Sequence, residues 1–144
     1  MTTESSSGAS RGEDLEEFIS RCHEALTQQS QGRPEPFLAL WSQADDVSIM
    51  AAIGGYQRGF QQVSDLLTSA SKTQHFDRWS AENIVTIVGD DLGFSVELEH
   101  YARQTDGDEE KMTLRATQVY RREAGAWRVI HRHGDVLTPI EVKW

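Results

Sequence analysis

The alternation of hydrophobic and polar residues predicts helices in the first half of this chain and strands in the second. From Glu13 onward, apolar residues recur at steps of three and four, which is the spacing of one helix face. Gly32, Pro34 and Pro36 end this helix, and a proline in a first turn favours a second, short helix over Phe37–Trp41. The apolar face of the first helix consists of Leu15, Phe18, Ile19, Cys22, Ala25 and Leu26.

A short strand and one more helix follow. The apolar run Val47–Ala52 predicts the strand, and the glycine-rich segment Gly54–Gly59 predicts a tight connection. A second amphipathic pattern then begins at Phe60 and fades near Ser71, which predicts a helix. The apolar face of that helix consists of Phe60, Val63, Leu66, Leu67 and Ala70.

The remainder of the chain has the pattern of an antiparallel sheet. Turn-forming residues interrupt it at Gly89–Asp91, Asp106–Asp108 and Ala124–Gly125. Helices followed by one run of long strands predict an α+β domain, with the helices packed on one face of a bent sheet. The predicted strands are Phe76–Val88, Leu92–Gln104, Lys111–Arg122 and Ala126–Leu137.

Composition limits the classes of partner. Met1–Gly12 is rich in serine, threonine and glycine, so we expect a disordered tail, followed by a single domain over residues 13–144. The net charge of −9 opposes binding to phosphate backbones and anionic lipid, so we expect neither nucleic acid nor membrane as a partner. The N-terminus lacks a signal-peptide pattern, and the longest apolar run, Ile49–Ile53, is too short to cross a bilayer. We therefore expect a cytoplasmic protein.

The last predicted strand has the most distinctive polar pattern. Trp127, Val129, His131, His133 and Asp135 follow at a spacing of two, and alternate side chains of a strand share a face. An imidazole beside a carboxylate titrates near physiological pH and can exchange a proton with a bound molecule. The two histidines and Asp135 are therefore the candidate catalytic residues.

The same three side chains have the types found in metal sites with two histidines and one carboxylate. Arg115 and Arg132 flank them, and their positive charges would repel a divalent cation. The lone cysteine, Cys22, excludes a site built from several thiolates within the chain. We therefore expect neither a metal nor another cofactor.

The predicted turns determine which side chains face each other. A loop at Asp106–Asp108 pairs Glu99 with Arg115 and Glu97 with Thr117, which keeps apolar positions opposite apolar ones. These pairs would lie side by side on one face of the sheet.

The next turn has two solutions. A three-residue loop, Glu123–Gly125, sets His133 opposite Arg115, whereas a two-residue loop sets His133 beside Ala116. We adopt the first as our hypothesis. It predicts one polar face across three strands, formed by Glu97, Glu99, Arg115, Thr117, His131, His133 and Asp135.

The order of elements and two strings resemble the nuclear-transport-factor-2-like superfamily, in particular its SnoaL-like and ketosteroid-isomerase-like branch of small bacterial proteins. The strings are LWSQADDVSIMAAIGGYQRGFQQV, Leu40–Val63, and LRATQVYRREAGAWRVIHRHGDV, Leu114–Val136. The resemblance implies a cone-shaped α+β barrel around a pocket, in a homodimer built through the sheet.

The resemblance also bears on chemistry. Isomerase members carry a carboxylate base at a position that falls at or next to Met50 in this sequence. Met50, Ala51 and Ala52 offer no carboxylate, so the isomerase base cannot be assigned to this chain. The final strand also resembles that of the calcium/calmodulin-dependent kinase association domain, in which the pair matched by His131 and His133 borders a pocket.

We expect the chain to bind a small, largely apolar organic molecule in the pocket. One alternative is a proton-transfer enzyme, an isomerase, cyclase or dehydratase, with a histidine as acid or base. Another is a noncatalytic dimerisation or assembly module. The candidate ligand-binding residues are Trp41, Tyr56, Glu99, Arg115, His131 and His133.

Overall fold

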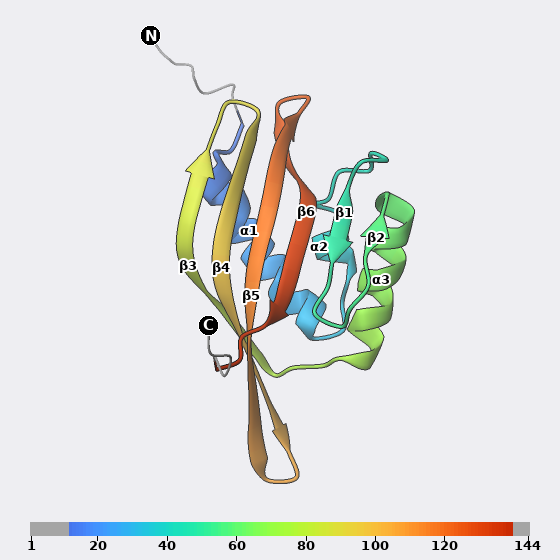
Figure 1. The fold of residues 1–144 in the computed structure, drawn as a ribbon, viewed down its shortest axis with the longest axis vertical. Coiled ribbons are helices and arrows are strands. Elements are labelled where there is room, and N and C mark those ends of the chain that lie inside the picture. Colours follow the sequence, from blue (N-terminus) through green and yellow to red (C-terminus); the bar gives the residue numbers. More distant parts are fainter. Residues whose placement is uncertain (1–11, 140–144) are drawn as a thin grey trace, which may run out of the picture.

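The computed structural model describes residues 12–139, so Met1–Arg11 of the predicted tail lies outside the described residues. The described elements agree with the predicted order of helices and strands, except that the strand β2 lies within Gly54–Gly59, where we predicted only a tight connection (Figure 1). They are α1 (Leu15–Ser30), α2 (Glu35–Leu38), β1 (Ser48–Met50), β2 (Gln57–Arg58), α3 (Phe60–Thr73), β3 (Arg78–Val88), β4 (Leu92–Thr105), β5 (Asp108–Glu123) and β6 (Ala126–Val136).

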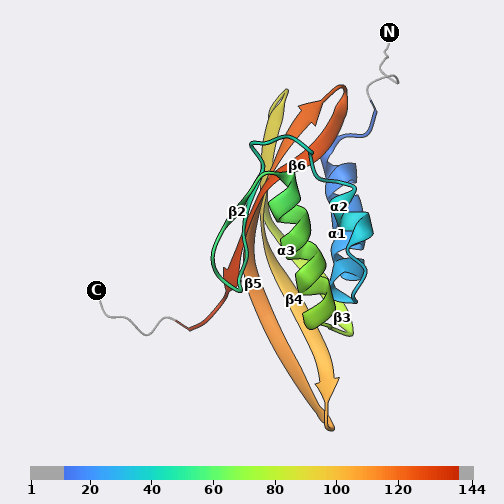
Figure 2. The ribbon, with the colours of Figure 1, turned by 90° about the vertical axis from the view of Figure 1, so that its right-hand side faces the viewer.

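The six described strands form one sheet in the order β2-β1-β6-β5-β4-β3. Neighbouring strands are antiparallel except β1 and β6, which are parallel. The sheet is bent but not closed, since β2 and β3 are free edges. The three helices lie on one side of it, and the other side carries no described helix (Figure 2). We call these the inner and the outer face. The predicted α+β class is thus confirmed.

Helix α1 begins where its sequence provides a cap. The Asp14 side chain accepts a hydrogen bond from the backbone N–H of Glu17 at 2.8 Å, and the Glu17 side chain accepts one from the Asp14 backbone at 2.9 Å. This reciprocal pair satisfies two N–H groups that the first turn leaves without partners. All six residues of the predicted apolar face are buried against the sheet.

Among the described residues, no helix is both long and apolar enough to cross a membrane.

The two hairpins close with shorter loops than we predicted. Asp106–Gly107 and Ala124–Gly125 are two-residue loops in which every residue has a positive φ, between 49° and 86°. This is the type I′ conformation, whose twist matches that of the flanking strands. As a result, Glu99 lies opposite Leu114 and Arg115 opposite Leu98. The predicted pairs of Glu99 with Arg115 and of Glu97 with Thr117 are wrong by one residue.

A β-bulge in β6 breaks the alternation that the sequence suggests. Tyr120 pairs with Val129, but the next residue of β5, Val119, pairs with His131, so Ile130 is extra. An extra residue reverses the faces of the strand beyond it. Trp127 and Val129 therefore point into the core, whereas His131, His133 and Asp135 lie on the outer face.

The predicted polar face is consequently divided between the two sides of the sheet. Arg115 and His133 share a face, as predicted, but it is the outer one, and the predicted pairing is wrong: His133 lies opposite Thr117, and Arg115 lies opposite Asp135. Glu97 and Glu99 lie on the inner face, where both are buried. Arg132, one residue away from the histidines, is also on the inner face.

Gly93 of β4 allows the sheet to approach α1 closely, and we predict that Gly93→Ala is destabilising. A Cβ there would lie 2.7 Å from Leu15 Cδ2 and 2.8 Å from the Ile87 carbonyl oxygen. Overpacking of this kind costs about 1–3 kcal/mol, to be measured as the free energy of unfolding in urea. Gly134→Ala is the control, because its Cβ would meet ordinary contacts at 3.7 and 3.9 Å. Equal losses for both variants would contradict the prediction.

Candidate functional site

A cavity of about 270 Å³ lies between the helices and the inner face of the sheet. α1 and α3 provide one wall, β4, β5 and β6 the other, and the segment after β1 contributes Ala51–Ile53. This position matches the pocket that the resemblance implies. The apolar lining consists of Leu26, Ile49, Ala51, Ala52, Ile53, Leu66, Leu67, Ala70, Phe76, Met112, Leu114 and Val136. The remaining lining residues are Gln29, Ser30, Gln74, Tyr101, Arg132 and Gly134.

Arg132 is the one charged residue among the described residues that line this cavity. It donates to the two carboxylate oxygens of Glu99 at 2.8 and 2.5 Å, and to the side-chain oxygen of Gln118 at 2.9 Å. Burial by itself would lower the pKa of Arg132, but the negative charge of Glu99 outweighs it and raises the pKa. Arg132 therefore stays charged although only 7% of it is exposed, and its partner Glu99 is 1% exposed.

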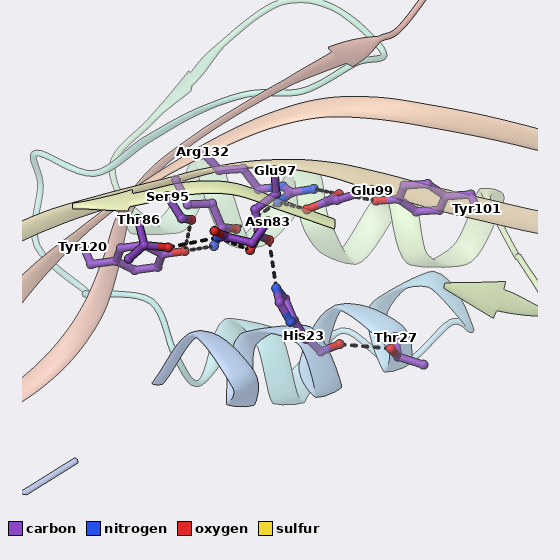
Figure 3. Close-up of polar contacts among 11 residues, drawn as sticks. His23, Thr27, Asn83, Thr86, Ser95, Glu97, Glu99, Tyr101, Tyr120 and Arg132 are labelled. Carbon is purple, nitrogen blue, oxygen red and sulfur yellow. Dashed lines mark hydrogen bonds and ion pairs between the residues drawn. The ribbon is translucent and has the colours of Figure 1, made fainter. Parts of the chain in front are cut away.

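Tyr101 extends the ion pair along the cavity wall. Its hydroxyl donates to Glu99 at 2.7 Å, so Glu99 accepts three hydrogen bonds (Figure 3). Burial, followed by the nearby charge of Glu99, raises the pKa of Tyr101 well above its usual value. The phenol is thus a hydrogen-bond donor at neutral pH and a poor base.

A second polar cluster joins α1 to the sheet outside the cavity lining. His23 Nε2 lies 2.8 Å from a carboxylate oxygen of Glu97, and the Asn83 side chain donates to the other oxygen at 3.0 Å (Figure 3). Burial tends to raise the pKa of Glu97, but the hydrogen bonds from His23 and Asn83 outweigh burial and lower it. Glu97 is therefore a buried carboxylate that stays ionised.

This cluster predicts a pH-dependent part of the stability. Because the pKa of Glu97 is lower in the folded state than its ordinary 4.5, its contribution is present above pH 4.5 and is lost as the pH falls through the folded pKa. We expect Glu97→Gln to cost about 1–3 kcal/mol of unfolding free energy at pH 7, and less at pH 3. Urea unfolding at both pH values measures this. The exposed Glu24 on α1 provides the control, Glu24→Gln, and an unchanged pH dependence in Glu97→Gln would refute the prediction.

The candidate ligand-binding residues from the sequence lie elsewhere. Trp41 is buried in the core beside Phe37, and Tyr56 is 72% exposed. Arg115 forms a bidentate ion pair with Asp135 on the outer face, at 2.7 and 2.8 Å. Glu99 does not line the cavity itself, but it holds two residues that do, Arg132 and Tyr101.

The two histidines of the last strand do not line the cavity either. The Nδ1 of His131 lies 2.8 Å from the Ser48 hydroxyl, and burial, followed by the nearby His133, lowers the pKa of His131. His133 borders a shallow hollow on the outer face together with Arg115 and Asp135. The expectation that these imidazoles face the interior is therefore wrong. Among residues 12–139, no group of three or more His, Cys, Asp or Glu side chains is placed to hold a metal ion.

Sequence reasoning missed Arg132, Tyr101 and Gln29 as cavity residues. From the strict alternation of β6 we placed Arg132 on the opposite face from the histidines, which is correct. We took the histidine face to be the inner one, and this is wrong. Gln29 donates from Nε2 to the Leu67 carbonyl at 2.7 Å, which joins α1 to α3 next to the cavity. A glutamine on the border of an apolar helix face was the available signal for this contact.

Several solved structures share this fold. A ketosteroid isomerase-like protein from Erwinia carotovora atroseptica has a TM-score of 0.72 at 16% identity, covering 87% of this chain and 95% of that one. A nuclear transport factor 2-like protein from Salmonella enterica has a TM-score of 0.71 at 17% identity, covering 94% and 97%. A Thiobacillus denitrificans protein, proposed to be a calcium/calmodulin-dependent protein kinase type II association domain, has a TM-score of 0.73 at 22% identity, covering 85% and 94%.

At these identities the likeness concerns the fold alone. No curated protein is similar to this chain at a significant level. The model of the SnoaL-like domain family matches residues 15–139, which is most of the chain and nearly all of its described part. The chain therefore belongs to the SnoaL-like domain family, within the nuclear-transport-factor-2-like fold.

Proposed function

We propose that this protein binds a small, largely apolar organic molecule in the cavity between its helices and its sheet. The observation that carries the proposal is the lining of that cavity, in which mostly apolar side chains surround one charged residue, Arg132, which Glu99 holds from behind the lining. Apolar walls with a few polar groups are typical of small-molecule sites, and about 270 Å³ suits a small ligand. The candidate residues Tyr56, Arg115, His131 and His133 have no part in this proposal.

Filling the cavity should abolish binding, and Ala70→Phe is the variant that tests this. Ala70 lies on α3 and lines the cavity, so a phenyl ring there occupies the space of the ligand. We expect affinity for a small apolar probe, measured by calorimetry or by thermal shift, to fall at least about tenfold. Ser69→Phe is the matched control, because Ser69 is the exposed neighbour on the same helix. Equal affinities in both variants would exclude this cavity as the site.

Proton transfer is the second candidate, and the likeness to a ketosteroid isomerase-like protein is what favours it. The described lining contains neither a carboxylate nor an imidazole, and Tyr101 is a poor base. Arg132, the charged residue of this lining, is suited to hold a ligand oxygen rather than to remove a proton, and the single O–H of Tyr101 is already donated to Glu99. We therefore propose binding as the primary function, and the candidate acids and bases His131, His133 and Asp135 are not carried forward.

We further propose that the protein forms a homodimer through the outer face of the sheet. Large apolar side chains are exposed there on β3 and β4: Val85 is 37%, Ile87 50% and Phe94 37% exposed. An apolar area of this kind on a sheet without a helix layer is typical of an interaction surface. The dimer is compatible with ligand binding, because the cavity lies between the helices and the inner face of the sheet. A cytoplasmic location stays a prediction from the sequence.

A further inference from the structure

We propose that the cavity selects a neutral molecule that presents a hydrogen-bond acceptor, such as a ketone or ester oxygen, to Arg132. The ligand class presupposes the proposed function, since it concerns what the same cavity binds. Two properties of Arg132 lead to this ligand class. Some N–H groups of its guanidinium have no hydrogen-bond partner among the described residues, and Glu99 already balances its charge.

The guanidinium of Arg132 has more donors than its protein partners use. An arginine side chain carries five N–H groups, and in Arg132 three of them donate, two to Glu99 and one to Gln118. The Nε–H and one N–H of Nη2 donate to no described residue. Arg132 is only 7% exposed, and donors in such surroundings are nearly always satisfied, by protein or by water. Because Arg132 lines the cavity, an acceptor on a bound molecule can take up this donor capacity.

The charge balance at the cavity excludes an anion as the preferred ligand. Arg132 and Glu99 together have no net charge, and the other described lining residues are uncharged. A carboxylate ligand would therefore add an uncompensated negative charge among apolar side chains, next to the carboxylate of Glu99. A neutral oxygen avoids this cost and still receives a hydrogen bond from a charged donor, which is stronger than one from a neutral donor.

A pure hydrocarbon would fill the apolar part of the cavity but leave the Arg132 donors without a partner. Displacing water from them without replacing its hydrogen bonds reduces affinity. At Arg132 the same consideration favours an acceptor over a donor group, because a guanidinium cannot accept a hydrogen bond. The side-chain oxygen of Gln29, a lining residue, is buried without a described partner and could accept a hydrogen bond from a second group of the ligand. The expected ligand is thus apolar over most of its surface and has an oxygen acceptor at one end.

Three probes of similar size test the ligand class on the unmodified protein: 2-acetylnaphthalene, 2-ethylnaphthalene and 2-naphthoate. In calorimetry at pH 7.5, we expect the affinity for 2-acetylnaphthalene to be at least about fivefold higher than that for 2-ethylnaphthalene. The affinity for 2-naphthoate should be the lowest of the three. The carbonyl stretch of bound 2-acetylnaphthalene should shift to lower wavenumber, as a hydrogen bond from a charged donor requires. Equal affinities for ketone and hydrocarbon, or a highest affinity for 2-naphthoate, would overturn the ligand class.

The double variant Arg132→Met/Glu99→Gln assigns the preference to Arg132 without leaving an unpaired charge in the core. We expect the preference for the ketone to fall below about twofold, while 2-ethylnaphthalene still binds. Arg115→Met/Asp135→Asn removes the corresponding pair on the outer face and should keep the full preference. If Arg132→Met/Glu99→Gln does not fold, the three affinities and the carbonyl shift measured with the unmodified protein still test the ligand class.

The outcomes separate this inference from the proposed function. Binding of 2-ethylnaphthalene that Ala70→Phe removes, together with no preference for the ketone, would leave a binding cavity with a different ligand class. If none of the three probes binds the unmodified protein, both proposals fail.

Discussion

Arg132→Met should lower the free energy of unfolding by about 3–5 kcal/mol, which is the largest loss that we expect from a single substitution in this chain. The substitution removes a positive charge next to Glu99, which is 1% exposed and then has only Tyr101 as a described hydrogen-bond donor. An unpaired buried carboxylate costs far more than a missing contact, because it must lose its hydration or take up a proton. Urea unfolding at pH 7 measures the loss.

Two variants separate the cost of the unpaired charge from other effects. Arg115→Met removes an arginine that also forms a bidentate ion pair, but this pair is exposed on the outer face and screened by water, so its loss should cost much less than that of Arg132. Arg132→Met/Glu99→Gln removes both charges and should recover much of the stability lost in the single variant. If Arg132→Met and Arg115→Met cost the same, the buried ion pair does not have the importance that its geometry indicates.

The helices and the order of the strands could be predicted because each depends on residues near one another in the sequence. The six-residue apolar face of α1 and the acidic residues of its first turn specify both the helix and its start at the Asp14 cap. The turn residues of the two long hairpins, Asp106–Asp108 and Ala124–Gly125, indicated where β4 and β5 end and where β5 and β6 begin. These features need no knowledge of what packs against them.

The faces of the strands could not be predicted with the same rules, because they depend on single residues in the loops and on one bulge. We counted Asp108 as part of the first loop, and the two-residue loop Asp106–Gly107 then moved every pair by one position. In β6, Ile130 looks like any other strand residue, yet it is the extra residue that turns His131 and His133 outward. Nothing in the local sequence marks it.

The candidate site shows a second limit of pattern reasoning. We predicted one polar face that holds Glu97 and Glu99 together with the histidines, whereas the inner face combines apolar walls with Glu97, Glu99 and Arg132, all of them buried. Each of these charges is tolerated because a residue distant in sequence satisfies it, such as His23 for Glu97. Such pairs appear only once three-dimensional neighbours are known, so Arg132 seemed to be a flanking residue instead of the polar centre of the cavity.

Phe94→Lys should convert the proposed homodimer into a monomer, the second large effect that we expect. Phe94 lies opposite Ile87 on the outer face, in the middle of the exposed apolar area of β3 and β4. In a two-fold symmetric dimer each substitution acts twice, and a buried lysine without a partner would face apolar side chains of the second copy. Aromatic residues at the centre of an interface often contribute 2 kcal/mol or more, so the dissociation constant should rise at least about a hundredfold.

Sedimentation velocity from 1 to 100 µM measures the effect, and urea unfolding of the monomer verifies that the variant is folded. Ser69→Lys adds the same charge on α3, away from the outer face, and should leave the dimer intact. Loss of the dimer in both variants would contradict a specific role of Phe94, since a lysine on either face only reduces the net charge of −9. A wild-type protein that sediments as a monomer at 100 µM would end the dimer proposal without affecting the cavity, because the two lie on opposite sides of the sheet.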